Sequence, residues 1–210
     1  MAGSQGRRAR RKRAGQYHHG DLRRALLEEA LRTIQAEGVE QLTLRTVGER
    51  LGVSRTALYR HFSDKQGLLA AVGREGFRML RLALTAAWEQ HGRGRRGFEA
   101  MGLAYVQFAV AHPSHYRVMF GRFIESCSKD DEFVEEATAA FTVLVDSLVE
   151  QQQASLVRRD DPLLLARFVW SVVHGIAMLT IDGQLQGPHD DGGRLPGYAI
   201  ERLRDAIGAA

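Results

Sequence analysis

Residues 43–62, TLRTVGERLGVSRTALYRHF, decide how this chain folds. Apolar side chains recur at helical spacing in two short runs, which predicts helices over 44–51 and 55–62. Thr43 and Ser54 stand directly before these runs and suit helix N-caps, since a hydroxyl accepts a hydrogen bond from a free backbone N–H. The turn between the two helices is too short for anything but a crossed pair. The stretch therefore predicts a helix-turn-helix.

The second of these helices divides into an apolar and a polar face. Leu58 faces a small core that it shares with Val47, Leu51 and Val53. The outer face is polar and largely basic, and its members are Arg55, Thr56, Tyr59, Arg60 and His61. Arg pairs bidentately with guanine, Thr hydrogen-bonds a base, and a Tyr hydroxyl suits a phosphate oxygen. This division fits a recognition helix in a major groove, and a solvated basic face on a helical hairpin is the alternative.

Helical periodicity continues on both sides of this unit. A helix is predicted from Asp21, as its N-cap, to Glu37 before Gly38. The stretch Ser63-Asp64-Lys65-Gln66 fits a capping box and opens a helix that runs to about Gln90. Further helices are predicted over 98–111, 113–127, 131–156, 161–185 and 198–208. Strand patterns are nearly absent, so we expect an all-α chain of about nine helices.

The charge of the chain is divided unevenly along its length. Residues 1–80 hold 16 Lys and Arg against 8 Asp and Glu, whereas residues 81–210 hold 13 against 17. The basic stretch at 1–16 has no large apolar side chain after Met1 and cannot offset its ordering entropy by burial, which predicts a disordered arm. We therefore expect this arm, a helix-turn-helix DNA-binding domain at 17–65, and a ligand-binding and dimerisation domain at 66–210.

The N-terminal stretch resembles a known DNA-binding domain. Tyr17-His18-His19-Gly20-Asp21-Leu22-Arg23, followed by TLRTVGERLGVSRTALYRHFSDKQGLL from Thr43, is similar to the DNA-binding domain of the tetracycline-repressor (TetR) family. The resemblance implies a dimer that binds a near-palindromic operator in two successive major grooves. It implies that Thr43, Tyr59, His61 and Lys65 hold phosphates and that Arg45, Arg55 and Thr56 meet bases. Ser54 and Arg60 complete the predicted set of DNA contacts.

Part of the second half also resembles this family. The stretches Ala111–Phe120, AHPSHYRVMF, and Trp170–Gly175, WSVVHG, are similar to a subgroup whose ligand domain carries a Trp-x-x-His-Gly signature. The ligands of that subgroup are diverse. The resemblance therefore implies a small-molecule effector without naming it.

A long apolar stretch, Leu163 to Ile181, predicts the dimer interface. A membrane span of about 20 residues is the competing interpretation, but Arg167 and His174 lie inside the stretch. A helix that is apolar on most sides must be buried on most sides, by its own subunit and by a partner. We expect a homodimer through the helices at about 161–185 and 198–208, with no membrane partner, as the TetR resemblance also implies.

Large, adaptable side chains between these helices predict a mostly apolar ligand site. Ordinary core packing is the alternative for each of them, and His174 suits a hydrogen-bonded interface position as well as a ligand contact. The candidates are Phe77, Trp88, Met101, Tyr105, Phe108, Tyr116, Met119, Phe123, Phe141, Trp170, His174 and Met178.

The sequence lacks the residue patterns that several classes of function require. Neither His18-His19-Gly20-Asp21 nor His112-Pro113-Ser114-His115 has the ligand spacing of a zinc site, and no phosphate-binding loop or hydrolase motif occurs. We expect no enzyme, no metal and no cofactor. The single cysteine, Cys127, and the absence of a signal peptide favour the cytoplasm. The sequence predicts a ligand-released repressor, with a nonspecific DNA-organising protein or a thiol- or metal-responsive regulator as alternatives.

Overall fold

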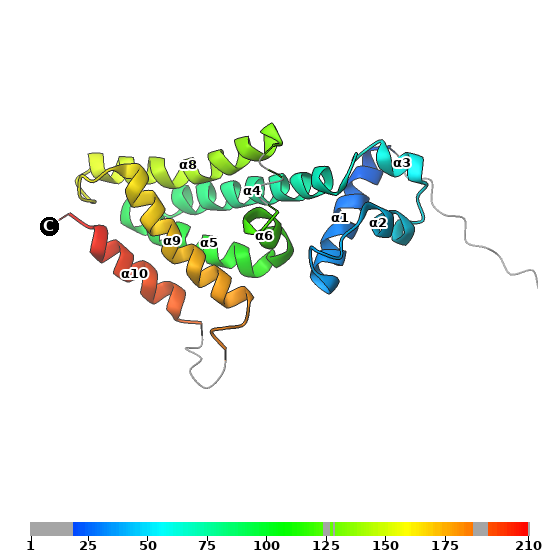
Figure 1. The fold of residues 1–210 in the computed structure, drawn as a ribbon. Helices are drawn as coiled ribbons and strands as arrows, with labels where there is room; N and C mark the ends of the chain where they lie inside the picture. The colour runs from blue at the N-terminus through cyan, green and yellow to red at the C-terminus, as the bar shows by residue number, and fades with distance from the viewer. Residues whose placement is uncertain (1–18, 124–126, 128, 187–192, 210) are drawn as a thin grey trace, which may run out of the picture.

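The computed structural model describes residues 19–123, 127, 129–186 and 193–209, and over these ranges it contains helices and no strand (Figure 1). The helices are α1 (His19–Glu37), α2 (Leu44–Leu51), α3 (Arg55–Tyr59), α4 (Lys65–Gln90), α5 (Gly94–Ala111), α6 (Pro113–Phe120), α8 (Asp131–Gln153), α9 (Pro162–Ile181) and α10 (Leu195–Ile207). The all-α prediction is confirmed. The predicted arm at 1–16 lies outside the described residues.

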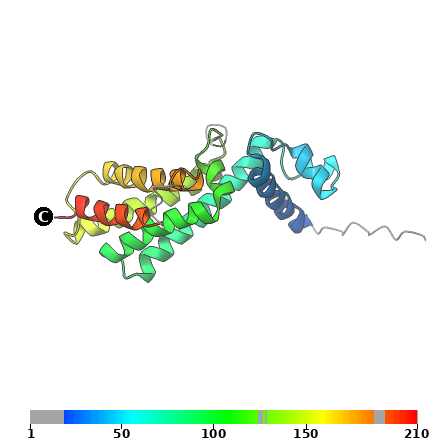
Figure 2. The same cartoon turned by 90° about the horizontal axis from the view of Figure 1, so that it is seen from below.

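The molecule is elongated, with α1, α2 and α3 at one end and the C-terminal helices at the other (Figures 1 and 2). At the first end, Leu26 and Ile34 of α1 pack with Val47 of α2 and Leu58 of α3, and all four side chains are almost fully buried. Burying one such side chain contributes about 1.5–3 kcal/mol. This small core holds the three helices together.

Arg50 fixes α2 against α1 through polar contacts. Its guanidinium donates to Thr33 Oγ1 at 2.9 Å and pairs with Glu37. A third α1 residue, Glu29, has Oε1 3.7 Å from Arg50 Nη1 and is itself largely buried. Polar contacts therefore add to the apolar packing between α1 and α2.

α4 is the longest helix and leads from the first end into the bundle. It begins at Lys65, and its N-cap is Asp64, whose Oδ1 accepts from the Gly67 N–H at 2.8 Å. The predicted cap at Ser63 is wrong by one residue, because the chain reaches helical geometry only after the extended backbone of Asp64. Farther along, α4 packs against α5, α6 and α8.

The C-terminal helices form a bundle around α4 and α5. α5 also packs against α9 and α10, while α8 covers α4 and α9. Two glycines allow close approach inside this bundle: Gly73 of α4 leaves room for the Phe133 ring, and Gly97 of α5 leaves room for Trp88. The bundle has an extensive apolar core, as the helical periodicity predicts.

Several helix ends differ from the prediction. α3 ends at Tyr59 rather than at Phe62, because Phe62 turns inward and is buried. α6 ends at Phe120 rather than at residue 127, since Gly121 adopts extended backbone and has no space for a side chain beside the Arg117 carbonyl. Smaller shifts of one to four residues affect the start of α1, α5 and α10, the end of α8, and both ends of α9.

Candidate DNA-binding surface and ligand cavity

The outer face of α3 is available for contact with a large partner. Arg55, Thr56, Tyr59 and Arg60 are exposed, and Tyr59 keeps 48% of its surface accessible. Within the described residues their side chains form no hydrogen bond or ion pair. The opposite face anchors the helix, because Leu58 is buried. These four side chains therefore project from a fixed element.

Side-chain caps fix the residues at which α2 and α3 begin. The Thr43 hydroxyl accepts from the Thr46 N–H at 3.0 Å, and the Ser54 hydroxyl accepts from the Ala57 N–H at 3.2 Å. Gly52 ends α2 with φ of 66°, a left-handed conformation that glycine adopts without strain. A Cβ at Gly48 would lie 3.3 Å from Leu58 Cδ2, so this position permits the close crossing of the helices.

Three other predicted DNA contacts already have partners in the protein. Arg45 Nε lies 2.8 Å from Glu49 Oε1 in an exposed pair, and the Thr43 hydroxyl lies 2.6 Å from that of Thr46. Lys65 Nζ donates to the Glu40 carbonyl at 3.0 Å and lies 5.3 Å from the centre of the Phe123 ring. Nothing in the sequence pattern indicated these partners of Lys65. His61 is half-buried at the end of α3.

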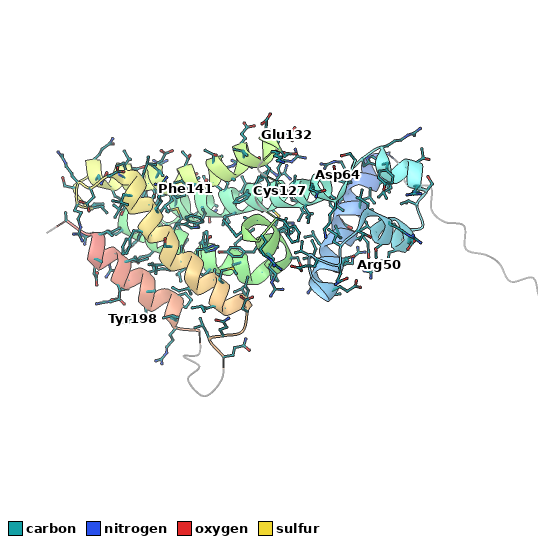
Figure 3. All side chains as sticks on the ribbon, viewed as in Figure 1. Arg50, Asp64, Cys127, Glu132, Phe141 and Tyr198 are labelled. Atoms are coloured by element: carbon teal, nitrogen blue, oxygen red, sulfur yellow. The ribbon has the colours of Figure 1, made fainter. Side chains whose placement is uncertain are left out.

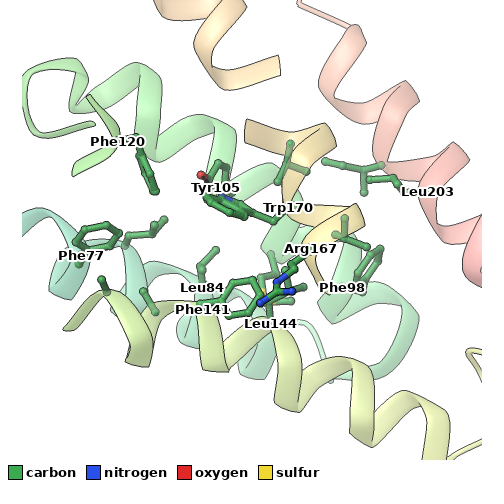
Figure 4. Close-up of a pocket in the computed structure, with 18 residues that line it drawn as sticks. Phe77, Leu84, Phe98, Tyr105, Phe120, Phe141, Leu144, Arg167, Trp170 and Leu203 are labelled. Atoms are coloured by element: carbon green, nitrogen blue, oxygen red, sulfur yellow. Dashed lines mark hydrogen bonds between the residues drawn. The ribbon is translucent and has the colours of Figure 1, made fainter. Parts of the chain in front are cut away.

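A cavity of about 360 Å³ lies inside the bundle (Figure 4). α4, α5, α6, α8, α9 and α10 contribute to its wall. The residues that line it are Phe77, Leu80, Leu84, Phe98, Met101, Gly102, Tyr105, Phe120, Ala137, Ala140, Phe141, Leu144, Arg167, Val169, Trp170, Val173, Ile200 and Leu203. Its size and apolar lining are typical of small-molecule sites.

Five of the twelve predicted ligand contacts lie in the wall of this cavity: Phe77, Met101, Tyr105, Phe141 and Trp170. The other seven, Trp88, Phe108, Tyr116, Met119, Phe123, His174 and Met178, are outside its lining. Tyr116 and Met119 are fully buried elsewhere in the core. The prediction included one residue of α8, Phe141, but missed the contribution of α10 and the charge of Arg167.

A hydrogen-bonded group of four side chains stands at one side of the cavity. Trp170 Nε1 donates to the Tyr105 hydroxyl at 2.9 Å, and the Tyr116 hydroxyl donates to the same oxygen at 2.9 Å. Nδ1 of His174 lies 2.6 Å from the Tyr116 hydroxyl and 3.1 Å from that of Tyr105.

Burial keeps this group uncharged. It raises the pKa of Tyr105 to about 12, raises that of Tyr116 further, and lowers the pKa of His174. A neutral His174 accepts a hydrogen bond at Nδ1 when that nitrogen carries no proton. The polar atoms of Tyr105 and Trp170 are therefore already paired, although both residues line the cavity.

The outer side of α9 carries large apolar side chains that the chain itself leaves uncovered. Leu163, Leu164 and Phe168 are at least 48% exposed, as is Tyr198 on α10, which points away from the bundle (Figure 3). α9 has the length and mean hydropathy, 1.7, of a membrane span, although the core helices of soluble proteins meet the same test. Val169, Trp170 and Val173 of the same helix line the cavity, and so does Arg167, which neighbours Leu163 and Leu164 on the exposed side.

The thiol and the histidines are not arranged as a sensor within the described residues. Cys127 is 1% exposed, and burial raises its pKa to about 11. The ring centroids of His112 and His115 are 5.9 Å apart, but no group of three or more metal-ligating side chains forms in the part of the chain that the structure describes. His18 lies outside that part.

Comparisons with known proteins agree with this architecture. A solved structure of a protein of unknown function from Rhodococcus sp. RHA1 is 34% identical, covers 91% of this chain and 97% of its own, and superposes with a TM-score of 0.79. An HTH-type transcriptional repressor of Mycobacterium tuberculosis is 27% identical over 69% of this chain and 74% of its own length. The class C tetracycline repressor of Escherichia coli is 46% identical over 50 residues, which are 23% of that repressor.

Two family descriptions match the chain. Residues 26–72 match the bacterial regulatory proteins of the tetR family, and residues 98–203 match the tetracyclin repressor-like C-terminal domain. In this chain three residues separate Trp170 from His174, one more than in the Trp-x-x-His-Gly signature, so the two side chains lie about one turn apart on α9. Members of the family are transcriptional regulators, not enzymes. The chain belongs to the tetracycline-repressor family.

Proposed function

We propose that the chain is a cytoplasmic, ligand-responsive repressor. A homodimer binds a near-palindromic operator through the α3 face, with help from the arm at 1–16, and a small molecule in the bundle cavity releases it. The DNA-binding domain covers 17–65, and the ligand-binding and dimerisation domain covers 66–210. A relation to the Trp-x-x-His-Gly subgroup is part of this proposal and is supported by the resemblance of Ala111–Phe120 and Trp170–Gly175, although the spacing from Trp170 to His174 is one residue longer than in the signature.

The observation that carries this proposal is the path of α4. The helix begins six residues after Tyr59, the last residue of α3. Phe77, Leu80 and Leu84 of the same helix line the cavity. The distance from Lys65 to Phe77 along the axis is about 18 Å at 1.5 Å per residue. A ligand that displaces these side chains therefore acts on the helix that supports α3.

The exposed apolar side of α9 supports the homodimer. When two copies bury Leu163, Leu164 and Phe168 against each other, the resulting dimer carries two α3 faces. Adjacent major grooves on one side of DNA are about 34–36 Å apart, so the dimer must hold its two α3 helices at that separation. Ligand and DNA then weaken each other's binding by the same factor, since the coupling is reciprocal.

The test is operator binding by fluorescence anisotropy. DNA from upstream of the chain's own gene is compared with an unrelated duplex at two salt concentrations. We expect selective binding that the double variant Arg55→Ala/Tyr59→Ala loses. Arg159→Ala is the matched control, because Arg159 is exposed in the α8–α9 connection, at the opposite end of the molecule from α3 (Figure 1).

Equal and steeply salt-dependent affinity for both duplexes, unchanged in the double variant, would contradict the proposal for this DNA. It would favour the nonspecific DNA-organising alternative, in which the basic arm alone supplies the affinity through phosphate contacts.

A further inference from the structure

One cation interrupts the apolar wall of the cavity. Of the residues that line it, Arg167 alone is charged, and no Asp or Glu is among them. The other polar groups of the lining are the Tyr105 hydroxyl and the Trp170 indole nitrogen, and these two are hydrogen-bonded to each other at 2.9 Å. A ligand therefore meets a single polar group without a partner.

The side chain of Arg167 is free to bind an anion. Within the described residues it forms no ion pair and no side-chain hydrogen bond. In Figure 4 the guanidinium lies between α9 and α8, toward Phe141 and Leu144. Arg167 is exposed in the single chain, and its side chain also borders the apolar space. This places a permanent cation at the edge of the cavity and an apolar interior behind it.

We infer that the cavity binds an apolar monocarboxylate, with its carboxylate on Arg167 and its hydrocarbon part among Phe77, Leu84, Phe98 and Phe141. The inference deepens the proposed function, because it names the chemical class of ligand for the same cavity. A guanidinium matches a carboxylate with two parallel hydrogen bonds, which a hydroxyl or an ester cannot accept in the same way.

The size of the cavity limits the length of this ligand. A water-sized group occupies about 30 Å³ in a liquid, so about 360 Å³ holds roughly a dozen non-hydrogen atoms. Decanoate has that number of atoms and is ionised at neutral pH, as carboxylic acids with a pKa near 4–5 are. Decan-1-ol and decylamine have nearly the same hydrocarbon body with a neutral and a cationic end.

The experiment measures direct binding of these three probes to the full chain without DNA. Calorimetry, or the tryptophan fluorescence of the chain, to which Trp170 in the cavity wall contributes together with Trp88, reports binding at probe concentrations below micelle formation. The quantity compared is the ratio of the decanol Kd to the decanoate Kd, which removes the common hydrocarbon contribution. We expect Arg167→Gln to lower this ratio at least tenfold and Arg167→Lys to keep part of it. Arg167→Glu should bind decylamine more tightly than decanoate.

The matched control is Arg159→Gln, which removes an exposed arginine that does not line the cavity. Circular dichroism and sedimentation establish that each variant keeps the fold and the oligomeric state of the unmodified chain. A ratio that is the same in the unmodified chain and in Arg167→Gln overturns the inference, as does a failure of decanoate to bind at all. Operator release is scored separately, so decanoate that binds through Arg167 but leaves DNA bound would overturn only the proposed effector role.

Discussion

At the scale of single residues, burial decides which polar side chains are available for chemistry. Arg55 and Tyr59 are exposed and without partners among the described residues, whereas Tyr105 and Tyr116 are buried and satisfy each other. Cys127 belongs to the buried group, although a single cysteine in the sequence suggested a thiol sensor as an alternative. Residue type alone therefore does not separate a binding group from a structural one.

The reactivity of Cys127 tests that alternative. A pKa of about 11, against an ordinary value of 9.0, leaves about a hundredfold less thiolate at neutral pH. We expect iodoacetamide to modify the folded chain at least a hundredfold more slowly than the urea-unfolded chain at pH 7. The rate in the folded chain should rise as the pH approaches 11, because the thiolate is the nucleophile. Equal rates in the two states would show an accessible, reactive thiol.

The cavity shows how far residue patterns predict a site. The abundance of large, adaptable side chains in this region predicted Phe77, Met101 and Tyr105 as ligand contacts, with ordinary core packing as the alternative. It could not separate Tyr105 from Tyr116, which is buried behind it in the core. Which side of a buried helix borders empty space depends on the neighbouring helices, and one helix pattern does not contain that information. Arg167 was noticed only as an argument against a membrane span.

At the scale of the elements, local signals predicted the helix-turn-helix more closely than the helix ends beyond it. Thr43 and Ser54 cap their helices as the sequence indicates, and Gly52 ends α2 in a left-handed turn, because capping and such turns depend on residues within a few positions. The ends of α3 and α6 depend instead on tertiary packing, since Phe62 and Gly121 respond to partners that are distant in the sequence.

The cap of α4 gives a test at this scale. We expect Asp64→Ala to lower the free energy of unfolding by about 0.5–2 kcal/mol, because the Gly67 N–H loses its acceptor. Ser63→Ala is the matched control and should change it by less than about 0.5 kcal/mol, as exposed substitutions usually do. Urea unfolding followed by circular dichroism measures both variants. A larger loss in Ser63→Ala than in Asp64→Ala would restore the capping box that the sequence suggested.

At the scale of the whole molecule, one chain presents one α3 face and one uncovered apolar surface on α9. Leu164 is 66% exposed, although the sequence of α9 is apolar on most sides. In the proposed homodimer, the high hydropathy of α9 has two causes, the cavity on one side and a second copy of the chain on the other. The sequence predicts both neighbours, since a helix that is apolar on most sides must be buried on most sides.

Charges on that surface should separate the two copies. We expect Leu164→Glu/Phe168→Glu to convert a dimer into a monomer in sedimentation experiments, because like charges and their desolvation oppose association. Operator affinity should fall at least tenfold, because the second copy of the protein must then reach its half-site from bulk solution and is no longer held beside it by the first copy. Leu82→Glu on α4 is the control, because Leu82 is 56% exposed and lies outside α9. A variant that remains dimeric would place the interface elsewhere.

The length of α4 has a mechanical consequence. With 26 residues the helix is about 39 Å long, so it can act as a lever arm whose fulcrum lies near the ligand. Phe77 lies about 18 Å from Lys65 along the axis, so a tilt of about 5° around Phe77 displaces the start of the helix by about 1.6 Å. In a two-fold symmetric pair the two displacements oppose each other and change the separation of the two α3 helices by up to roughly one base-pair step of 3.4 Å. In the proposed mechanism, a ligand of about a dozen atoms is therefore large enough to change the match between the two α3 helices and successive major grooves.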